Sequence, residues 1–168
     1  MPDSQTPYTR TISLPVQTDN SGRPWYAGTE DGKGGLKFSC TQCGHCCSGG
    51  PGYVWLSDAD FVRIADFLKV PVETFTKEYV RRIGNDFSLT EKKGYDCVFL
   101  VRKDGLATCG IYEVRPTQCG TWPFWNQNLK SPDAWSRASA HCPGMCDADA
   151  PLYDVAYIEE RRQNPESP

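Results

Sequence analysis

"FSCTQCGHCCSGG", residues 38–50, places four cysteines within eight positions, and these are Cys40, Cys43, Cys46 and Cys47. Thiols grouped this closely are typical of disulfides, reactive nucleophiles, metal ligands or small buried side chains. The repeated interval of two residues lets a tight loop present two thiolates to one metal, and it matches the first three ligands of a bacterial ferredoxin loop. Cys47 departs from that pattern because it directly follows Cys46. Since adjacent side chains point apart, this pair can serve different metal ions or bridge a polynuclear centre.

The cysteine count and the N-terminal sequence together favour metal over disulfides. The chain has nine cysteines, an odd number that excludes complete internal pairing. The N-terminal segment has neither an apolar run of signal-peptide length nor a small-residue cleavage pattern, so we expect a cytoplasmic protein. In that reducing compartment disulfides are rare, and cysteine-rich patterns usually bind metal or carry out redox chemistry. Disulfides stay an alternative for a chain that is exported by another route.

Composition indicates one small, loop-rich domain. The chain has 168 residues, with 15 Gly, 13 Pro and only 39% apolar residues, which favours short elements around a thin core. A net charge of −3 gives no electrostatic reason to expect nucleic acid or an anionic membrane as a partner. No stretch approaches the roughly 20 apolar residues that span a bilayer. We therefore expect neither nucleic acid nor membrane binding.

Three regions are predicted along the chain. Residues 1–35 are rich in Pro, Gly, Ser, Thr and Asp, and we expect an extended arm that lies on the domain or is partly disordered. Residues 36–147 are predicted to form a cysteine-cluster metal-binding domain. Residues 148–168 are predicted to form a C-terminal helix and tail, with Asp149 as the cap and Pro151 in the first turn.

Two helices are predicted after the first cysteine group. The first begins after Ser57, a suitable cap, and its apolar stripe consists of Phe61, Ile64, Ala65 and Leu68. The second is predicted from Pro71 to about Ile83, with Gly84 as its stop. Further along, residues 115–128 are too broken by Pro and Gly to be regular.

A β-hairpin is predicted over residues 95–114, with its turn at Asp104-Gly105. A two-residue turn places Cys109 opposite Leu100 and puts Cys97 on the other side of the ribbon. Even if Cys97 and Cys109 lay on the same face of the ribbon, they would be about 13 Å apart along regular strands. Ligands of one ion lie only about 2.3 Å from it. Either the ribbon bends, or the domain has two sites or one extended cluster.

The distribution of the cysteines favours metal ligation over passive burial. Core cysteines would follow the period of a helix or strand. Here both predicted helices lack cysteine, and most thiols fall in glycine-flanked loops, where backbone can wrap around an ion. The candidates outside the first group are Cys97, Cys109, Cys119, Cys142 and Cys146.

Four motifs together resemble one known family. They are Cys40-x2-Cys43-Gly44-His45-Cys46-Cys47, "GYDCVFL" at 94–100, "CGIYEVRPTQC" at 109–119 and "WPF" at 122–124. This combination resembles the cysteine-cluster family of YkgJ type, known as a zinc- or iron-chelating domain and often labelled an iron–sulfur-cluster protein. The resemblance covers roughly residues 36–146.

The resemblance implies a set of metal ligands, which are Cys40, Cys43, Cys46, Cys47, Cys97, Cys109 and Cys119. Cys142 matches a "CPG" element that often closes the domain. Cys146 completes the candidate list, although the family more often has other residues there. Gly120 also departs from the family, which frequently has Arg after the third late cysteine.

Several other residues lie beside the candidate ligands. His45 and His141 can each replace a cysteine on zinc or iron, or donate a hydrogen bond to a thiolate or cap a loop. Arg115 is a candidate cofactor-binding residue, because its guanidinium would stabilise an anionic cluster; the alternative is a surface ion pair with Glu113. The aromatic residues near Cys119 can shield a redox cluster, line a pocket or form core, and they are Trp122, Phe124, Trp125 and Trp135.

These observations lead to one interpretation with three alternatives. We expect an α+β domain, small and loop-rich, with short helices and a hairpin around a cysteine-ligated metal centre. An iron–sulfur cluster is favoured over zinc, with a possible redox or electron-transfer role and a protein redox partner. The alternatives are a zinc-stapled protein-interaction module, a metal-dependent enzyme of unknown substrate, and metal storage or delivery. No catalytic motif is present that decides whether the protein is an enzyme.

Overall fold

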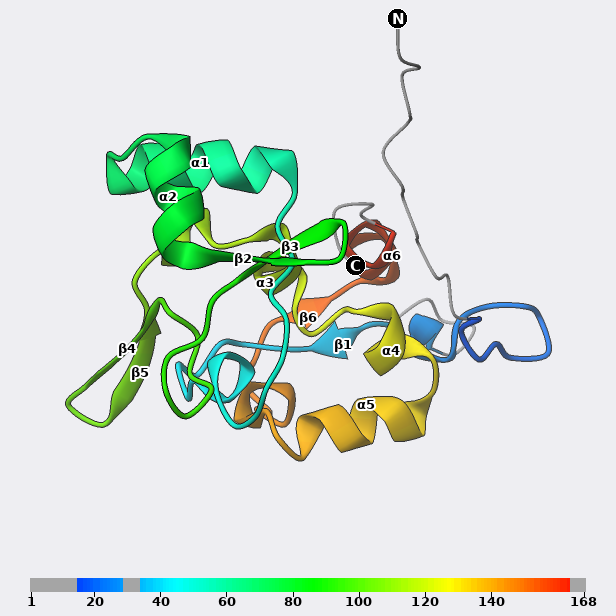
Figure 1. Cartoon of the computed structure of the whole chain (residues 1–168). Coiled ribbons are helices and arrows are strands. Elements are labelled where there is room, and N and C mark those ends of the chain that lie inside the picture. The colour runs from blue at the N-terminus through cyan, green and yellow to red at the C-terminus, as the bar shows by residue number, and fades with distance from the viewer. Residues whose placement is uncertain (1–14, 29–33, 164–168) are drawn as a thin grey trace, which may run out of the picture.

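The computed structural model describes residues 15–28 and 34–163, and Figure 1 shows their arrangement. Within these residues, short helices combine with two-stranded antiparallel sheets in one domain, so the predicted α+β class is confirmed. The α-helices are α1 (Asp58–Leu68), α2 (Val72–Tyr79), α3 (Thr117–Thr121), α4 (Asn126–Leu129), α5 (Pro132–Ser139) and α6 (Val155–Arg162). The strands are β1 (Leu36–Lys37), β2 (Val80–Ile83), β3 (Asp86–Leu89), β4 (Leu100–Lys103), β5 (Leu106–Cys109) and β6 (Leu152–Tyr153).

Helix α1 forms where the sequence predicts it. The Ser57 hydroxyl accepts a hydrogen bond from the backbone N–H of Asp60, and the Asp60 carboxylate accepts one from the backbone N–H of Ser57. This reciprocal capping box satisfies two N–H groups that a helix start leaves without partners. The inward face of the helix buries Ile64 and Ala65.

Helix α2 is shorter than predicted. It ends at Tyr79, and Val80–Ile83 forms strand β2, which pairs with β3. The prediction of a helix to Ile83 was therefore wrong. Gly84 has a φ of +62° and begins a tight turn, so the chain folds back as a hairpin instead of continuing the helix.

The first core lies between α1, α2, strand β3 and the residues that flank the β4–β5 hairpin. Its buried members are Ile64, Ala65, Phe75, Leu89, Phe99 and Ile111. Each fully buried large apolar side chain contributes about 1.5–3 kcal/mol relative to an exposed one. This core supports one wall of the cysteine region, because Cys97 and Cys109 pack against it.

Strands β4 and β5 form the predicted hairpin, which extends away from the body of the domain (Figure 1). Its register pairs Leu100 with Cys109, as predicted. The ladder ends at that pair, and Cys97 instead forms an isolated bridge with Glu91. The strands are therefore not regular as far as Cys97, and the chain bends between the two cysteines.

The C-terminal third differs from the sequence prediction in several places. Helix α3 and most of helix α4 form within the stretch that was predicted to be irregular. Helix α5 was not predicted, although Ser131 caps it and Pro132 occupies its first turn. The last helix begins later than predicted: Asp154, rather than Asp149, caps α6, and residues before it form β6, which pairs with β1. Local cap signals occur at both aspartates, and pairing with β1 decides between them.

A second, aromatic core joins the segment 15–28 to helix α6. Its buried residues are Tyr26, Leu36, Phe124, Leu129 and Ile158. The Trp25 indole N–H donates to the Leu129 carbonyl at 2.7 Å, so residues 15–28 pack on the domain. The rest of the predicted arm, residues 1–14 and 29–33, lies outside the described residues, as does the tail from 164, and the region boundaries stay predictions.

None of the helices in the described part of the chain has the length and apolar character that crossing a bilayer requires.

Candidate metal centre

The first cysteine loop is docked on the hairpin by backbone contacts. The Ala107 N–H donates to the Gln42 carbonyl at 3.1 Å, and the Cys97 N–H donates to the Cys47 carbonyl at 2.7 Å. Gly44 has a φ of +75°, and a Cβ there would lie 2.4 Å from the Cβ of Ala107. Only glycine fits this approach. The loop is therefore held beside Cys97 and the end of strand β5.

The turn that carries Cys142 is docked on the same loop from another side. The Ser39 N–H donates to the Gly144 carbonyl at 3.0 Å. A Cβ on Gly144 would lie 1.7 Å from the Ser39 carbonyl oxygen, so the two backbones are in close contact. The His45 Nδ1 also lies 2.9 Å from the His141 carbonyl oxygen. Since a carbonyl only accepts, Nδ1 carries the proton, and Nε2 is the ring nitrogen that a metal could use.

Cysteines from three separate regions of the chain line one cavity of about 250 Å³, which we call the main cavity. These cysteines are Cys40, Cys46, Cys47, Cys97, Cys109 and Cys119. Cys119 comes from helix α3, not from the loop that the sequence predicts. No Asp or Glu is among the described residues that line this cavity. Six thiols and no carboxylate favour a thiophilic metal over Mg²⁺ or Ca²⁺.

A second cavity of about 90 Å³, which we call the side cavity, is also lined by the first cysteine loop. Its potential ligands are Cys40, Cys43, Cys46, Cys142, His45 and His141. Trp122 also lines it, and its hydrogen bond to the Cys142 thiol holds that side chain. Cys146 lines neither cavity, and its Sγ lies 3.8 Å from the Ser139 carbonyl oxygen.

Arg115 is the cation of the main cavity. Its guanidinium lies over the Tyr112 ring, 4.2 Å from the ring centroid. Among the described residues no ion pair joins it to a carboxylate, so the alternative of a pair with Glu113 is not formed. Burial raises the pKa of Cys109 and Cys119, and the charge of Arg115 opposes that shift. The pKa of Cys46 is lowered mainly by its hydrogen bond with Cys47, and Arg115 adds to this effect.

The thiols of the main cavity affect one another's ionisation. Burial raises the pKa of Cys119, and the charges of Cys97, Cys46 and Cys109 raise it further. The sulfurs of Cys46 and Cys47 lie 3.6 Å apart, and their hydrogen bond lowers the pKa of Cys46 to about 7 while raising that of Cys47. Several buried thiolates cannot coexist without a compensating cation. A bound metal ion supplies such a charge and deprotonates the thiols it binds.

The described side chains do not form a closed coordination sphere. In residues 15–28 and 34–163, no three His, Cys, Asp or Glu side chains stand close enough together to hold one ion. The cysteines share cavities, and a metal would draw their sulfurs inward by side-chain rotation. The donor set fits a thiophilic metal, and the fold and site together define a small cysteine-rich α+β domain with thiol-lined cavities.

Comparison with known proteins identifies the family. Residues 39–146 match the family CxxCxxCC, described as "Putative zinc- or iron-chelating domain". The match covers more than half of the chain, and the chain belongs to this family. Membership in this family supports metal binding, and the family description names zinc or iron as the metal.

One relative is named "Uncharacterized protein MJ0661", from Methanocaldococcus jannaschii. It is 32% identical over 90 residues, which are 54% of this chain and 46% of the relative. The match thus spans less than half the length of that protein. No solved structure matches the chain.

Sequence reasoning missed residues that place the ligands. Tyr112 supports Arg115, and Trp122 contacts Cys142, but no local pattern identifies either partner. Gly144 had a usable signal, because a glycine between Cys142 and Cys146 suggests close backbone approach. The aromatic residues divide in role. Phe124 and Trp135 stack in the second core at 6.0 Å, whereas Trp122 faces both cavities.

Proposed function

We propose that the domain carries an iron–sulfur cluster or another thiolate-ligated metal cluster in the main cavity, with a redox or electron-transfer role. The observation that carries this proposal is the convergence of cysteines from the first loop, the hairpin and helix α3 on one cavity without a carboxylate. About 10–15 Å³ already admits a water molecule. The main cavity, at about 250 Å³, is therefore large enough for a polynuclear centre.

The cysteines divide into two proposed ligand groups. Cys46, Cys47, Cys97, Cys109 and Cys119 serve the main cavity. Cys43 and Cys142 serve the side cavity, with Nε2 of His45 as a further donor. Cys40 and Cys46 border both cavities. Arg115 would stabilise the anionic thiolates of the main cavity, since its charge favours the ionised forms of Cys46, Cys109 and Cys119.

The metal is tested on protein purified without oxygen. A brown protein with iron and acid-labile sulfide in matching amounts supports the iron–sulfur proposal. A colourless protein with stoichiometric zinc contradicts it.

The division of ligands is tested with two cysteine variants. We expect Cys119→Ser to lose most of the metal of the main cavity, because Cys119 lines that cavity. Cys146→Ser should retain wild-type metal content, because Cys146 lines neither cavity. Equal losses in the two variants would contradict the division.

A second candidate function is a zinc-stapled protein-interaction module. The side cavity favours it, because three cysteines and a histidine in a small space are a frequent set of structural zinc ligands. This candidate predicts a redox-silent protein that a chelator unfolds.

Three further points belong to the proposal. A cytoplasmic location is proposed because such a reducing compartment keeps thiols free to bind metal. A protein redox partner follows from the electron-transfer role. A metal-dependent enzyme would require an open coordination position, so full cysteine ligation at every metal would contradict it.

A further inference from the structure

Asp60 lies outside both cavities. The role inferred for it below rests on the proposed metal-binding function. Asp60 is a charged residue with 0% exposure on helix α1. A buried carboxylate is costly unless its oxygens are paired and hydrogen-bonded. One oxygen, Oδ2, accepts from the Ser57 backbone N–H and hydroxyl, each at 3.0 Å. These bonds cap the helix and satisfy one of the two carboxylate oxygens.

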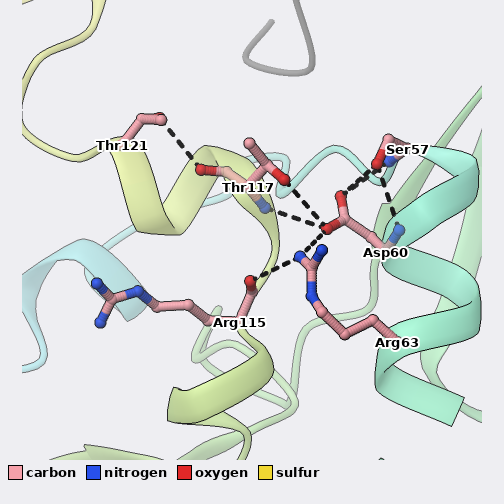
Figure 2. Close-up of polar contacts among 6 residues, drawn as sticks. All are labelled: Ser57, Asp60, Arg63, Arg115, Thr117 and Thr121. Carbon is pink, nitrogen blue, oxygen red and sulfur yellow. Dashed lines mark hydrogen bonds and ion pairs between the residues drawn. The ribbon is translucent and has the colours of Figure 1, made fainter. Parts of the chain in front are cut away.

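The other oxygen faces a different segment of the chain. Oδ1 accepts from the Thr117 backbone N–H at 3.2 Å and from the Thr117 hydroxyl at 3.4 Å. Thr117 is the first residue of α3, the helix that carries Cys119. Figure 2 shows the Asp60 carboxylate between Ser57 on one side and Thr117 on the other. The carboxylate therefore joins the start of α1 to the start of α3.

Arg63 extends this link to Arg115. Its Nη2 donates to Asp60 Oδ1 and also to the Arg115 carbonyl oxygen, the latter at 3.1 Å. In Figure 2 the Arg115 side chain runs away from Arg63, so only its backbone takes part in this contact. The backbone is thus fixed at Arg115 and at Thr117, on either side of Pro116.

The fixed segment carries two groups of the main cavity. Arg115 and Cys119 both line it, whereas Asp60 and Arg63 do not. A shift of residues 115–117 would move the guanidinium and the thiol together. Groups that orient metal ligands from outside commonly change metal affinity by about 10–100-fold when they are replaced.

We propose that Asp60 is a positioning residue for the metal centre. Through Thr117 and Arg63, its carboxylate sets where Arg115 and Cys119 enter the main cavity. Its role in capping α1 is separate, because the two oxygens serve different partners.

Asp60→Asn tests this role in the full chain reconstituted without oxygen with Co²⁺, a thiophilic and spectroscopically visible probe. Asparagine keeps the shape of the side chain, but its NH2 group cannot accept from a backbone N–H. We expect weaker thiolate-to-cobalt charge-transfer absorption and about tenfold faster transfer of Co²⁺ to a chelator. Ser57→Ala is the matched control, since it removes a cap hydroxyl and leaves Thr117 and Arg63 in contact with Asp60. It costs about 1 kcal/mol of stability and should leave the cobalt spectrum unchanged.

A second pair of variants keeps the test decisive if Asp60→Asn does not fold. Thr117→Val removes the hydroxyl that donates to Asp60 and keeps the side-chain shape, whereas Thr117→Ser keeps the hydroxyl. We expect faster Co²⁺ loss from the valine variant and near-wild-type retention in the serine variant. Equal Co²⁺ retention in both members of each pair that folds would overturn the positioning role. Wild-type chain that binds no Co²⁺ would overturn the proposed function as well, so the two failures are distinguishable.

Discussion

At Gly144, the backbone that leads from Cys142 to Cys146 touches the backbone that precedes Cys40. A Cβ there would meet the Ser39 carbonyl oxygen at 1.7 Å, a distance that only a backbone shift can relieve. This contact is what brings the last cysteine turn to the first cysteine loop. The side cavity depends on it, because Cys40 and Cys142 both line that cavity.

Gly144→Ala should therefore destabilise the domain by about 1–3 kcal/mol, the usual cost of overpacking. It should also weaken metal binding at the side cavity. Urea unfolding and metal content measure the two effects. Gly50→Ala is the control, because a Cβ on Gly50 meets nothing within 4 Å. Equal stability of the two variants would contradict the close contact.

Arg115 is the residue at which charge and metal binding should be coupled. Arg115→Gln removes the guanidinium whose charge favours the ionised forms of the Cys46, Cys109 and Cys119 thiols. We expect about tenfold faster transfer of the bound metal to a chelator, with little change in urea stability because the guanidinium forms no ion pair among the described residues.

Arg115→Lys keeps the positive charge and should restore most of the metal retention. Equal metal retention in the Arg115→Gln and Arg115→Lys variants would show that charge at this position does not affect metal binding.

At the scale of elements, helix α5 leads the chain to His141 and Cys142, and its start depends on one cap. The Ser131 hydroxyl accepts from the Ala134 N–H at 3.2 Å. Ser131→Ala should lower the free energy of unfolding by about 1 kcal/mol. Ser136→Ala changes an exposed serine of the same helix that caps nothing, and should leave stability unchanged or slightly raised. The comparison is made by urea unfolding, and identical midpoints would contradict the cap.

Elements were predictable where their signals are local. The cap of α1 and the two-residue turn at Asp104-Gly105 gave the first helix and the hairpin register. The end of α2 could not be predicted in this way, because an apolar residue at Val80 is equally compatible with a continuing helix and with the start of a strand. Strand β6 was missed for a similar reason: Pro151 suits a helix start, and only pairing with β1 reveals the strand.

At the scale of the whole molecule, a polar cluster at the second core joins the segment 15–28 to helix α6. The Tyr26 hydroxyl donates to Glu159 on α6, and Arg162 donates to the same carboxylate at 3.0 Å. Burial raises the pKa of the Glu159 carboxyl, but hydrogen bonds from Arg162, Tyr26 and Gln163 outweigh it and hold the pKa below 4.5, its ordinary value.

This pKa shift predicts a pH dependence of stability. Because the folded pKa lies below the unfolded one, the contribution of Glu159 is present above pH 4.5 and is lost as the pH falls through the folded value. Glu159→Gln should therefore lower stability at neutral pH and reduce the slope of stability against pH in the acid range. Urea unfolding between pH 7 and about pH 3 measures that slope. Glu160→Gln, an exposed neighbour, should keep the wild-type slope.

The candidate site was predictable in its chemistry and not in its geometry. Cysteine type and spacing identified the thiols, but the sequence could not assign them to cavities. That assignment depends on backbone contacts between distant residues, such as Gln42 with Ala107 and Ser39 with Gly144. No local pattern encodes these contacts. The conflict over Cys97 and Cys109 is resolved in the same way. The ladder begins only at Leu100, so Cys97 lies outside it, and both cysteines line the main cavity.

The most direct test of the account is native mass spectrometry of the full chain purified without oxygen, compared with the same sample after denaturation. We predict a folded species that carries the mass of bound metal, with or without sulfide, and that loses this mass on unfolding. Its cysteines other than Cys146, which lines neither cavity, should resist alkylation until then. A folded species at the mass of the bare chain, with all nine thiols open to alkylation, would contradict the claim that a metal draws these cysteines together.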